Sequence, residues 1–128
     1  MKGFKSIIFN WLPPIIWMMF IFFLSSQTKV SVTHQFISDF IIFKTLHVIE
    51  YSILYLLLFR AFYSIKNQKL SFNSKLILPI IIGFFYSITD ELHQLRVPTR
   101  SGRLVDTGFD LIGIILMYTL IKKYLANK

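Results

Sequence analysis

The sequence contains no cysteine, which excludes disulfide bonds, a thiol nucleophile and thiolate metal sites. Charge is scarce too: 16% of the 128 residues are charged, whereas soluble domains carry about a quarter. Acidic residues are the rarest, at 6 against 14 Lys and Arg. The sequence has no internal repeat and no low-complexity segment. A disulfide-stapled secreted domain is therefore excluded, and we expect a single domain over residues 1–128.

Apolar side chains are abundant instead, at 55% of the residues. They gather into four runs of about 20 residues, the length that crosses a bilayer core of about 30 Å. We predict an all-α, four-span transmembrane helical bundle with spans at about 7–24, 46–62, 76–92 and 104–121. A charged start before the first run also fits a secretory signal. Because that run is too long and lacks a following cleavage site, we expect an uncleaved span.

The polar connection after the first span has a helical pattern of its own. Phe36, Ile37, Phe40, Ile41 and Lys44 recur at spacings of three and four residues. Residues at these spacings share one face of a helix. An amphipathic helix of this kind lies flat in the membrane interface. We therefore predict a short interfacial helix between spans 1 and 2.

The basic residues predict the orientation of the chain. Eight Lys residues and Arg60 fall on one predicted side of the membrane, and five basic residues fall on the other. Because cytoplasmic loops carry the excess of Lys and Arg, we expect a multi-pass cell-membrane protein with both termini cytoplasmic and extracytoplasmic motif-bearing loops. The charges lie between apolar runs rather than in a stripe, so membrane lipids are the expected partners and nucleic acid is not.

The few acids have an informative distribution. Five of the six lie in or beside predicted spans. Counted at 1.5 Å per residue, Glu50, Asp90 and Asp110 lie about 18–23 Å from the cytoplasmic edge of three different spans. A charge at the bilayer centre costs about 2.5–3.5 kcal/mol, so these side chains should face inward. We predict that they share a polar, acidic pocket that opens outward.

Such a pocket offers the titratable groups that general acid–base catalysis requires. The candidate catalytic residues are Glu50, Asp90, His47 and His93, with an acid as the base and a histidine as proton donor or metal ligand. The candidate substrate-binding residues are Lys44, Tyr51, Glu91, Gln94, Arg100, Asp106 and Asp110. Among these, Arg100 would clamp a phosphate or carboxylate. Histidine with carboxylates also suits a divalent metal such as Zn, Mn or Fe, which stays an open alternative.

The polar segments also follow one another in a specific order over nearly the whole chain. They are Ser25-Ser26-Gln27, K-x-x-H-x-x-E-Y at 44–51, D-E-L-H-Q at 90–94, V-P-x-R and S-G-R at 97–103, and D-x-x-x-D-x-x-G at 106–113. In these segments the chain resembles the VanZ-like membrane proteins, a family named for an accessory protein of teicoplanin resistance. The resemblance implies four spans and an association with the cell envelope, and it supplies no mechanism.

Several functions stay open at this point. The first is an enzyme acting on an envelope lipid or lipid-linked glycan. The second is a non-catalytic binder of an anionic lipid, a wall precursor or a glycopeptide; the resemblance extends this to a contribution to teicoplanin-type glycopeptide resistance. The third is a structural network in which Lys44, Arg96, Arg100 and Arg103 neutralise the acids. An ion pathway is disfavoured because a relay needs acids at several depths.

Overall fold

The computed structural model describes residues 2–29, 31–66, 70–100 and 102–128. These ranges contain α1 (Lys2–Ser26), α2 (Phe36–Tyr63), α3 (Phe72–Gln94), the 3₁₀ turn η1 (Leu104–Asp106) and α4 (Thr107–Ala126). Within them the chain has no strand, and four helical segments are long and apolar enough to cross a membrane. The predicted all-α, four-span architecture is thus confirmed for the described part. Lys69 and Ser101, which belong to the patterns above, lie outside these ranges.

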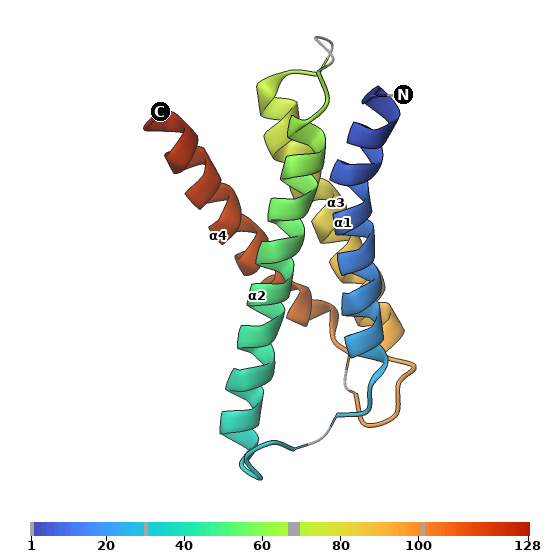
Figure 1. The fold of residues 1–128 in the computed structure, drawn as a ribbon. Coiled ribbons are helices and arrows are strands. Elements are labelled where there is room, and N and C mark those ends of the chain that lie inside the picture. The colour runs from blue at the N-terminus through green and yellow to red at the C-terminus, as the bar shows by residue number, and fades with distance from the viewer. Residues whose placement is uncertain (1, 30, 67–69, 101) are drawn as a thin grey trace.

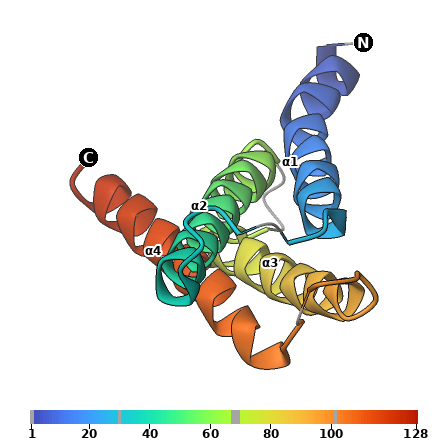
Figure 2. The same ribbon diagram turned by 90° about the horizontal axis from the view of Figure 1, so that it is seen from below.

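The helices alternate in direction through the bundle. The start of α1 and the end of α4 lie at the same end, which we call the terminal end (Figure 1). The connections 27–35 and 95–103 lie at the opposite end, which we call the site end (Figure 1). Seen from below, α2 lies in the middle of the other three helices, and α4 diverges from α1 toward its C-terminus (Figure 2).

The predicted short interfacial helix is wrong, because residues 36–44 form the first turns of α2 and continue directly into the second span. No Pro or Gly occurs between Phe36 and Tyr63 to interrupt the helix. At 28 residues, α2 is about 42 Å long and exceeds a bilayer core of about 30 Å. The other helices also extend a few residues past the predicted spans.

Asp39 secures the start of α2. Its carboxylate accepts hydrogen bonds from the backbone N–H groups of Val32 and Thr33, and from the hydroxyls of Ser31 and Thr33. The preceding connection is thereby folded onto the first turn of the helix. Asp39 is the acid that the sequence patterns left without a role, and the structure gives it this local one.

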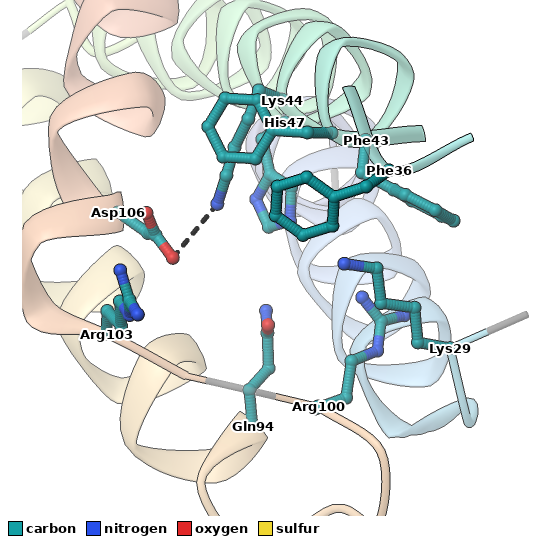
Figure 3. Close-up of a pocket in the computed structure, with 10 residues that line it drawn as sticks. Lys29, Phe36, Phe43, Lys44, His47, Gln94, Arg100, Arg103 and Asp106 are labelled. Atoms are coloured by element: carbon teal, nitrogen blue, oxygen red, sulfur yellow. Dashed lines mark ion pairs between the residues drawn. The ribbon is translucent and has the colours of Figure 1, made fainter. Parts of the chain in front are cut away.

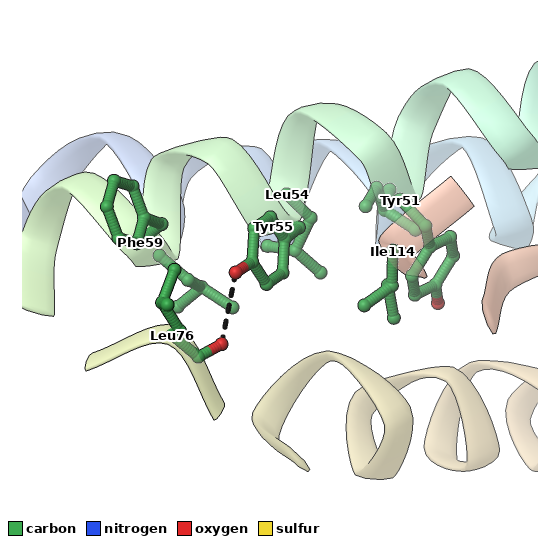
Figure 4. Packing of buried hydrophobic residues seen from close by; sticks show 8 residues of the cluster. Tyr51, Leu54, Tyr55, Phe59, Leu76 and Ile114 are labelled. Atoms are coloured by element: carbon green, nitrogen blue, oxygen red, sulfur yellow. Dashed lines mark hydrogen bonds between the residues drawn. The ribbon is translucent and has the colours of Figure 1, made fainter. Parts of the chain in front are cut away.

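The apolar core is built around α2 and contacts all four helices. A hydroxyl on one of its aromatic residues joins two helices, since Tyr55 donates a hydrogen bond of 3.0 Å to the Leu76 carbonyl (Figure 4). The core consists of Ile21, Tyr51, Leu54, Tyr55, Leu58, Phe59, Leu76 and Ile114. Because lipid tails are as apolar as these side chains, close packing and interhelical hydrogen bonds hold the helices together.

The closest backbone approach at a glycine on α4 is to α2. A Cβ built on Gly113 would overlap the Val48 carbonyl of α2. The Ser52 hydroxyl also donates a hydrogen bond of 2.9 Å to the Gly113 carbonyl. Small residues permit this kind of helix contact in membranes. Gly113 therefore fixes how near α4 lies to α2.

We predict that Gly113→Ala destabilises the protein, because the added methyl forces the α2 and α4 backbones apart. Overpacking of this kind costs about 1–3 kcal/mol. Gly108→Ala is the matched control, since a Cβ at Gly108 would meet nothing within 4 Å. Both variants replace a glycine of α4 by alanine, which favours the helix, so a lower thermal unfolding midpoint in detergent for Gly113→Ala alone reports the lost contact. Equal midpoints would contradict the packing described here.

Candidate functional site

Polar side chains from α2, α3 and α4 meet inside the bundle toward the site end. The centre of this set is Asp110, which has no exposed surface. His47 Nδ1 lies 2.9 Å from Asp110 Oδ1, and the Ser87 hydroxyl donates to Asp110 Oδ2 at 2.6 Å. One carboxylate from α4 is thus bonded to α2 and α3. A buried acid in a membrane helix is expected to find partners of this kind.

Asp90 lies nearby on the inward face of α3, with 2% of its surface exposed. Its Oδ2 accepts hydrogen bonds from the Tyr51 hydroxyl at 3.4 Å and from the Gln94 amide at 3.2 Å. Gln94 also donates to the Ser25 hydroxyl of α1 at 3.4 Å. Asp90 Oδ1 has no hydrogen-bond partner within the described residues. Such a buried, unpartnered oxygen needs an explanation, because nearly all buried polar atoms are satisfied.

Glu91 connects α3 to the loop that follows it. The carboxylate, 1% exposed, accepts a hydrogen bond of 2.9 Å from the backbone N–H of Arg103. A Cβ at Gly102 would overlap the backbone of Glu91 and Leu95, so only glycine fits where the loop returns against α3. The Arg103 side chain is thereby placed beside the polar cluster.

An ion pair closes the outer edge of the cluster. Lys44 Nζ lies 2.9 Å from Asp106 Oδ2 and packs over the rings of Phe40 and Phe109. Arg100 instead crosses to α1, donating hydrogen bonds of 3.0 Å to the carbonyls of Leu24 and Gln27. These carbonyls belong to the C-terminal end of α1, where backbone acceptors lack helical partners.

Two predicted catalytic residues lie apart from the Asp110 cluster. The ring of His93 stacks on Phe22 of α1 at 4.3 Å, and its Nε2 lies 2.9 Å from the Ser26 hydroxyl. His93 lines neither of the cavities described next. The Glu50 carboxylate, half-buried, makes no ion pair or hydrogen bond in the described part of the chain. It does line the second of these cavities, together with His47.

The first cavity, of about 180 Å³, opens at the site end above the cluster. Figure 3 shows Lys29 and Arg100 on one wall and Arg103 on the opposite one, with Gln94 reaching in from below. The cavity is lined by Lys29, Phe36, Phe40, Phe43, Lys44, His47, Gln94, Arg100, Arg103 and Asp106. Its one carboxylate, Asp106, is already paired with Lys44.

The second cavity, of about 290 Å³, lies between the end of α1 and the first half of α2. It shares Lys29, Phe43, His47 and Arg100 with the first cavity, so the two are neighbours. Most of its exposed lining is apolar, including Leu24, Val32, Phe43 and Leu46. Together the cavities form a polar recess with an apolar extension.

The sequence patterns gave no role to several residues of this region. Ser87 holds Asp110, and its signal was its spacing of three residues from Asp90 on the same face of α3. Ser25 belongs to one of the polar segments, and its hydroxyl is buried against Gln94. No local pattern marks Lys29 or Phe43 as cavity residues, because they come from separate elements that meet only in the fold.

Four apolar helices with a buried polar cluster define a multi-pass helical membrane protein. The model of the VanZ/LLP1 family matches residues 10–126, nearly the entire chain. The chain therefore belongs to the VanZ/LLP1 family. Comparison with curated proteins gave no match, and neither did comparison with solved structures.

Proposed function

We propose that this protein binds a phosphate-bearing amphiphile of the cell envelope, either an anionic lipid or a lipid-linked wall precursor. One observation carries the proposal: a recess rich in cationic side chains continues into an apolar cavity. An amphiphile with an anionic headgroup needs both environments, one beside the other.

The headgroup would be held in the first cavity. Lys29, Arg100 and Arg103 line it, and none of them forms an ion pair with an acid in the described residues. Guanidinium groups bind phosphate through paired, charge-assisted hydrogen bonds. The Arg103 side chain is the most available of the three, because the Arg100 guanidinium donates to two carbonyls and Lys29 packs over the Phe43 ring.

The lipid chain would occupy the second cavity. Its apolar lining comes from α1, α2 and the connection between them, and it is half-open. An acyl or prenyl chain entering from the surrounding leaflet would therefore lie between α1 and α2. Arg100 borders both cavities, which places a cation where headgroup and chain would join.

The proposed ligand lies in the outer leaflet if both termini are cytoplasmic. Support for this orientation comes from the basic residues, whose excess falls toward the terminal end. The site end, with its loops and cavities, would then face the extracytoplasmic side of the cell membrane.

The absence of natural cysteine makes this orientation directly testable. We predict that Pro98→Cys, at an exposed residue of the connection after α3, reacts with a membrane-impermeant maleimide in intact cells. Asn127→Cys, exposed at the terminal end, should react only after the membrane is permeabilised. The reverse labelling pattern would place the cavities on the cytoplasmic side.

Ligand binding is tested with purified protein in detergent. We predict that phosphatidylglycerol or a polyprenyl phosphate binds, whereas diacylglycerol, which lacks the phosphate, does not. Arg103→Gln should weaken binding about tenfold or more, since a charge-assisted hydrogen bond contributes about 1.5–3 kcal/mol and 1.4 kcal/mol is tenfold. Arg96→Gln is the matched control, because Arg96 is exposed and lines neither cavity. Equal affinities for phosphorylated and phosphate-free lipid would contradict the proposal.

A second candidate function is catalysis on the same amphiphile. His47 favours it, because the bond from Nδ1 to Asp110 fixes the imidazole and leaves Nε2 for proton transfer. Glu50 lines the same cavity as His47 and has no partner of its own. These groups would supply an acid–base pair beside a bound headgroup.

Glu50→Gln separates the two functions. The variant keeps the size of the side chain and disturbs no contact of the Glu50 carboxylate, so lipid binding should persist. Catalysis predicts that mass spectrometry of envelope lipids and wall precursors shows a difference between cells with and without the protein, and that this difference is lost in Glu50→Gln. A binder predicts no chemical change in either case. A contribution to teicoplanin resistance would follow from capture of a wall precursor and is measured as drug susceptibility.

A further inference from the structure

We propose that His47, Glu91 and Asp110 form a binding site for a divalent metal ion between α2, α3 and α4. Each residue offers one ligand atom, and the three atoms lie within 4.8 Å of one another. Bonds of about 2.0–2.2 Å in a tetrahedral site place ligand atoms about 3.3–3.6 Å apart. Small side-chain movements would bring the three to that spacing. This site lies deeper inside the bundle than the proposed phosphate recess, which His47 also lines. The metal proposal does not depend on the phosphate proposal.

Hydrogen bonds from neutral groups orient both carboxylates. The Ser87 hydroxyl holds Asp110 Oδ2, and the Arg103 backbone N–H holds Glu91 Oε2. Carboxylates that bind metals are typically fixed by such outer hydrogen bonds. The second oxygen of Asp110 contacts His47 Nδ1, and a bound ion would replace that bond as the link between these two residues.

The three buried acids of the cluster also have few positively charged neighbours. Asp90, Glu91 and Asp110 are each at most 2% exposed. In the described part of the chain no Lys or Arg forms an ion pair with any of them, and His47 is the one ionisable group that does. Uncompensated buried charge is strongly unfavourable. An ion of charge +2 would compensate it, since metal coordination is one of the ways proteins accommodate buried acids.

Asp90 supplies an independent observation. Its Oδ1 is buried without a partner, although its Oδ2 has two. Asp90 adjoins Glu91, and Tyr51, which bonds its Oδ2, is one helical turn from His47. The Asp90 carboxylate is therefore bonded to α2 and adjoins a residue of the ligand set on α3. A water molecule on the metal would give Asp90 Oδ1 the donor it lacks.

The donor set favours particular metals. One imidazole with carboxylates and no thiolate suits Zn²⁺ or Mn²⁺ better than Mg²⁺ or Ca²⁺, which take oxygen ligands almost alone. The chain has no cysteine that could form a competing site elsewhere.

The test uses the full chain, purified in detergent, treated with chelator and then loaded with Zn²⁺, Mn²⁺ or Mg²⁺. After desalting, we expect about one equivalent of Zn²⁺ or Mn²⁺ per chain by mass spectrometry, with a raised melting temperature, and no retained Mg²⁺. Glu91→Gln and Asp110→Asn should lose both effects. Glu50→Gln, an acid on the helix of His47 but outside the ligand set, should keep them.

The wild-type protein provides a second measurement, which does not depend on the variants folding. X-ray absorption of the zinc-loaded chain should show a shell of nitrogen and oxygen with a single imidazole. Two imidazoles, retention of metal by Glu91→Gln and Asp110→Asn, or the absence of stoichiometric Zn²⁺ and Mn²⁺ would each overturn the proposal. Lipid affinity of Arg103→Gln is measured separately, so failure of this site leaves the phosphate proposal standing.

Discussion

A carboxylate inside a membrane bundle must take its hydrogen bonds from the protein, because the hydrocarbon around it offers none. Asp110 meets this constraint through His47 on one side and Ser87 on the other. A single residue of α4 thus determines where α2 and α3 lie. Gly113, three residues further along α4, brings the α2 backbone into contact at the same level. Polar bonding and close packing therefore act on the same three helices.

Charge is layered along the bundle as a result. The buried acids lie inside, and the pair of Lys44 with Asp106 lies beyond them. Lys29 and Arg103 line the same cavity as that pair and form no ion pairs in the described part of the chain. The proposed anion site is therefore at the outer level, and the proposed cation site is at the inner one. A phosphate ester held above a bound cation would experience both fields at once.

Much of this arrangement could be predicted from residue spacing. The spans followed from the lengths of the apolar runs, and the inward direction of Asp90 and Asp110 followed from the cost of exposing them to lipid. The interfacial helix was predicted wrongly, since an amphipathic pattern does not reveal whether a helix continues through Lys44 into the next span. The spacing of apolar residues shows which face of a helix is apolar. It does not show where the helix ends when no Pro or Gly interrupts it.

The contacts of individual side chains were harder to predict than the helix face on which they lie. His93 is the neighbour of Gln94, which bonds Asp90, yet neighbours in a helix point about 100° apart, and His93 consequently faces Phe22 and Ser26 of α1. A pocket was predicted, but the linings of the two cavities were not, because their walls combine residues from three helices and two connections. Such surfaces depend on how helices are set against one another, which local spacing does not encode.

The contact at Gly113 has a mechanical consequence. Because α2 and α4 are held backbone to backbone, we expect these two helices to move together. The contacts of α1 include side-chain hydrogen bonds that involve Trp17, Ser25, Ser26, Tyr86 and Arg100. We therefore expect an adjustment to the girth of a bound lipid chain to come from a shift of α1 rather than from α2 or α4.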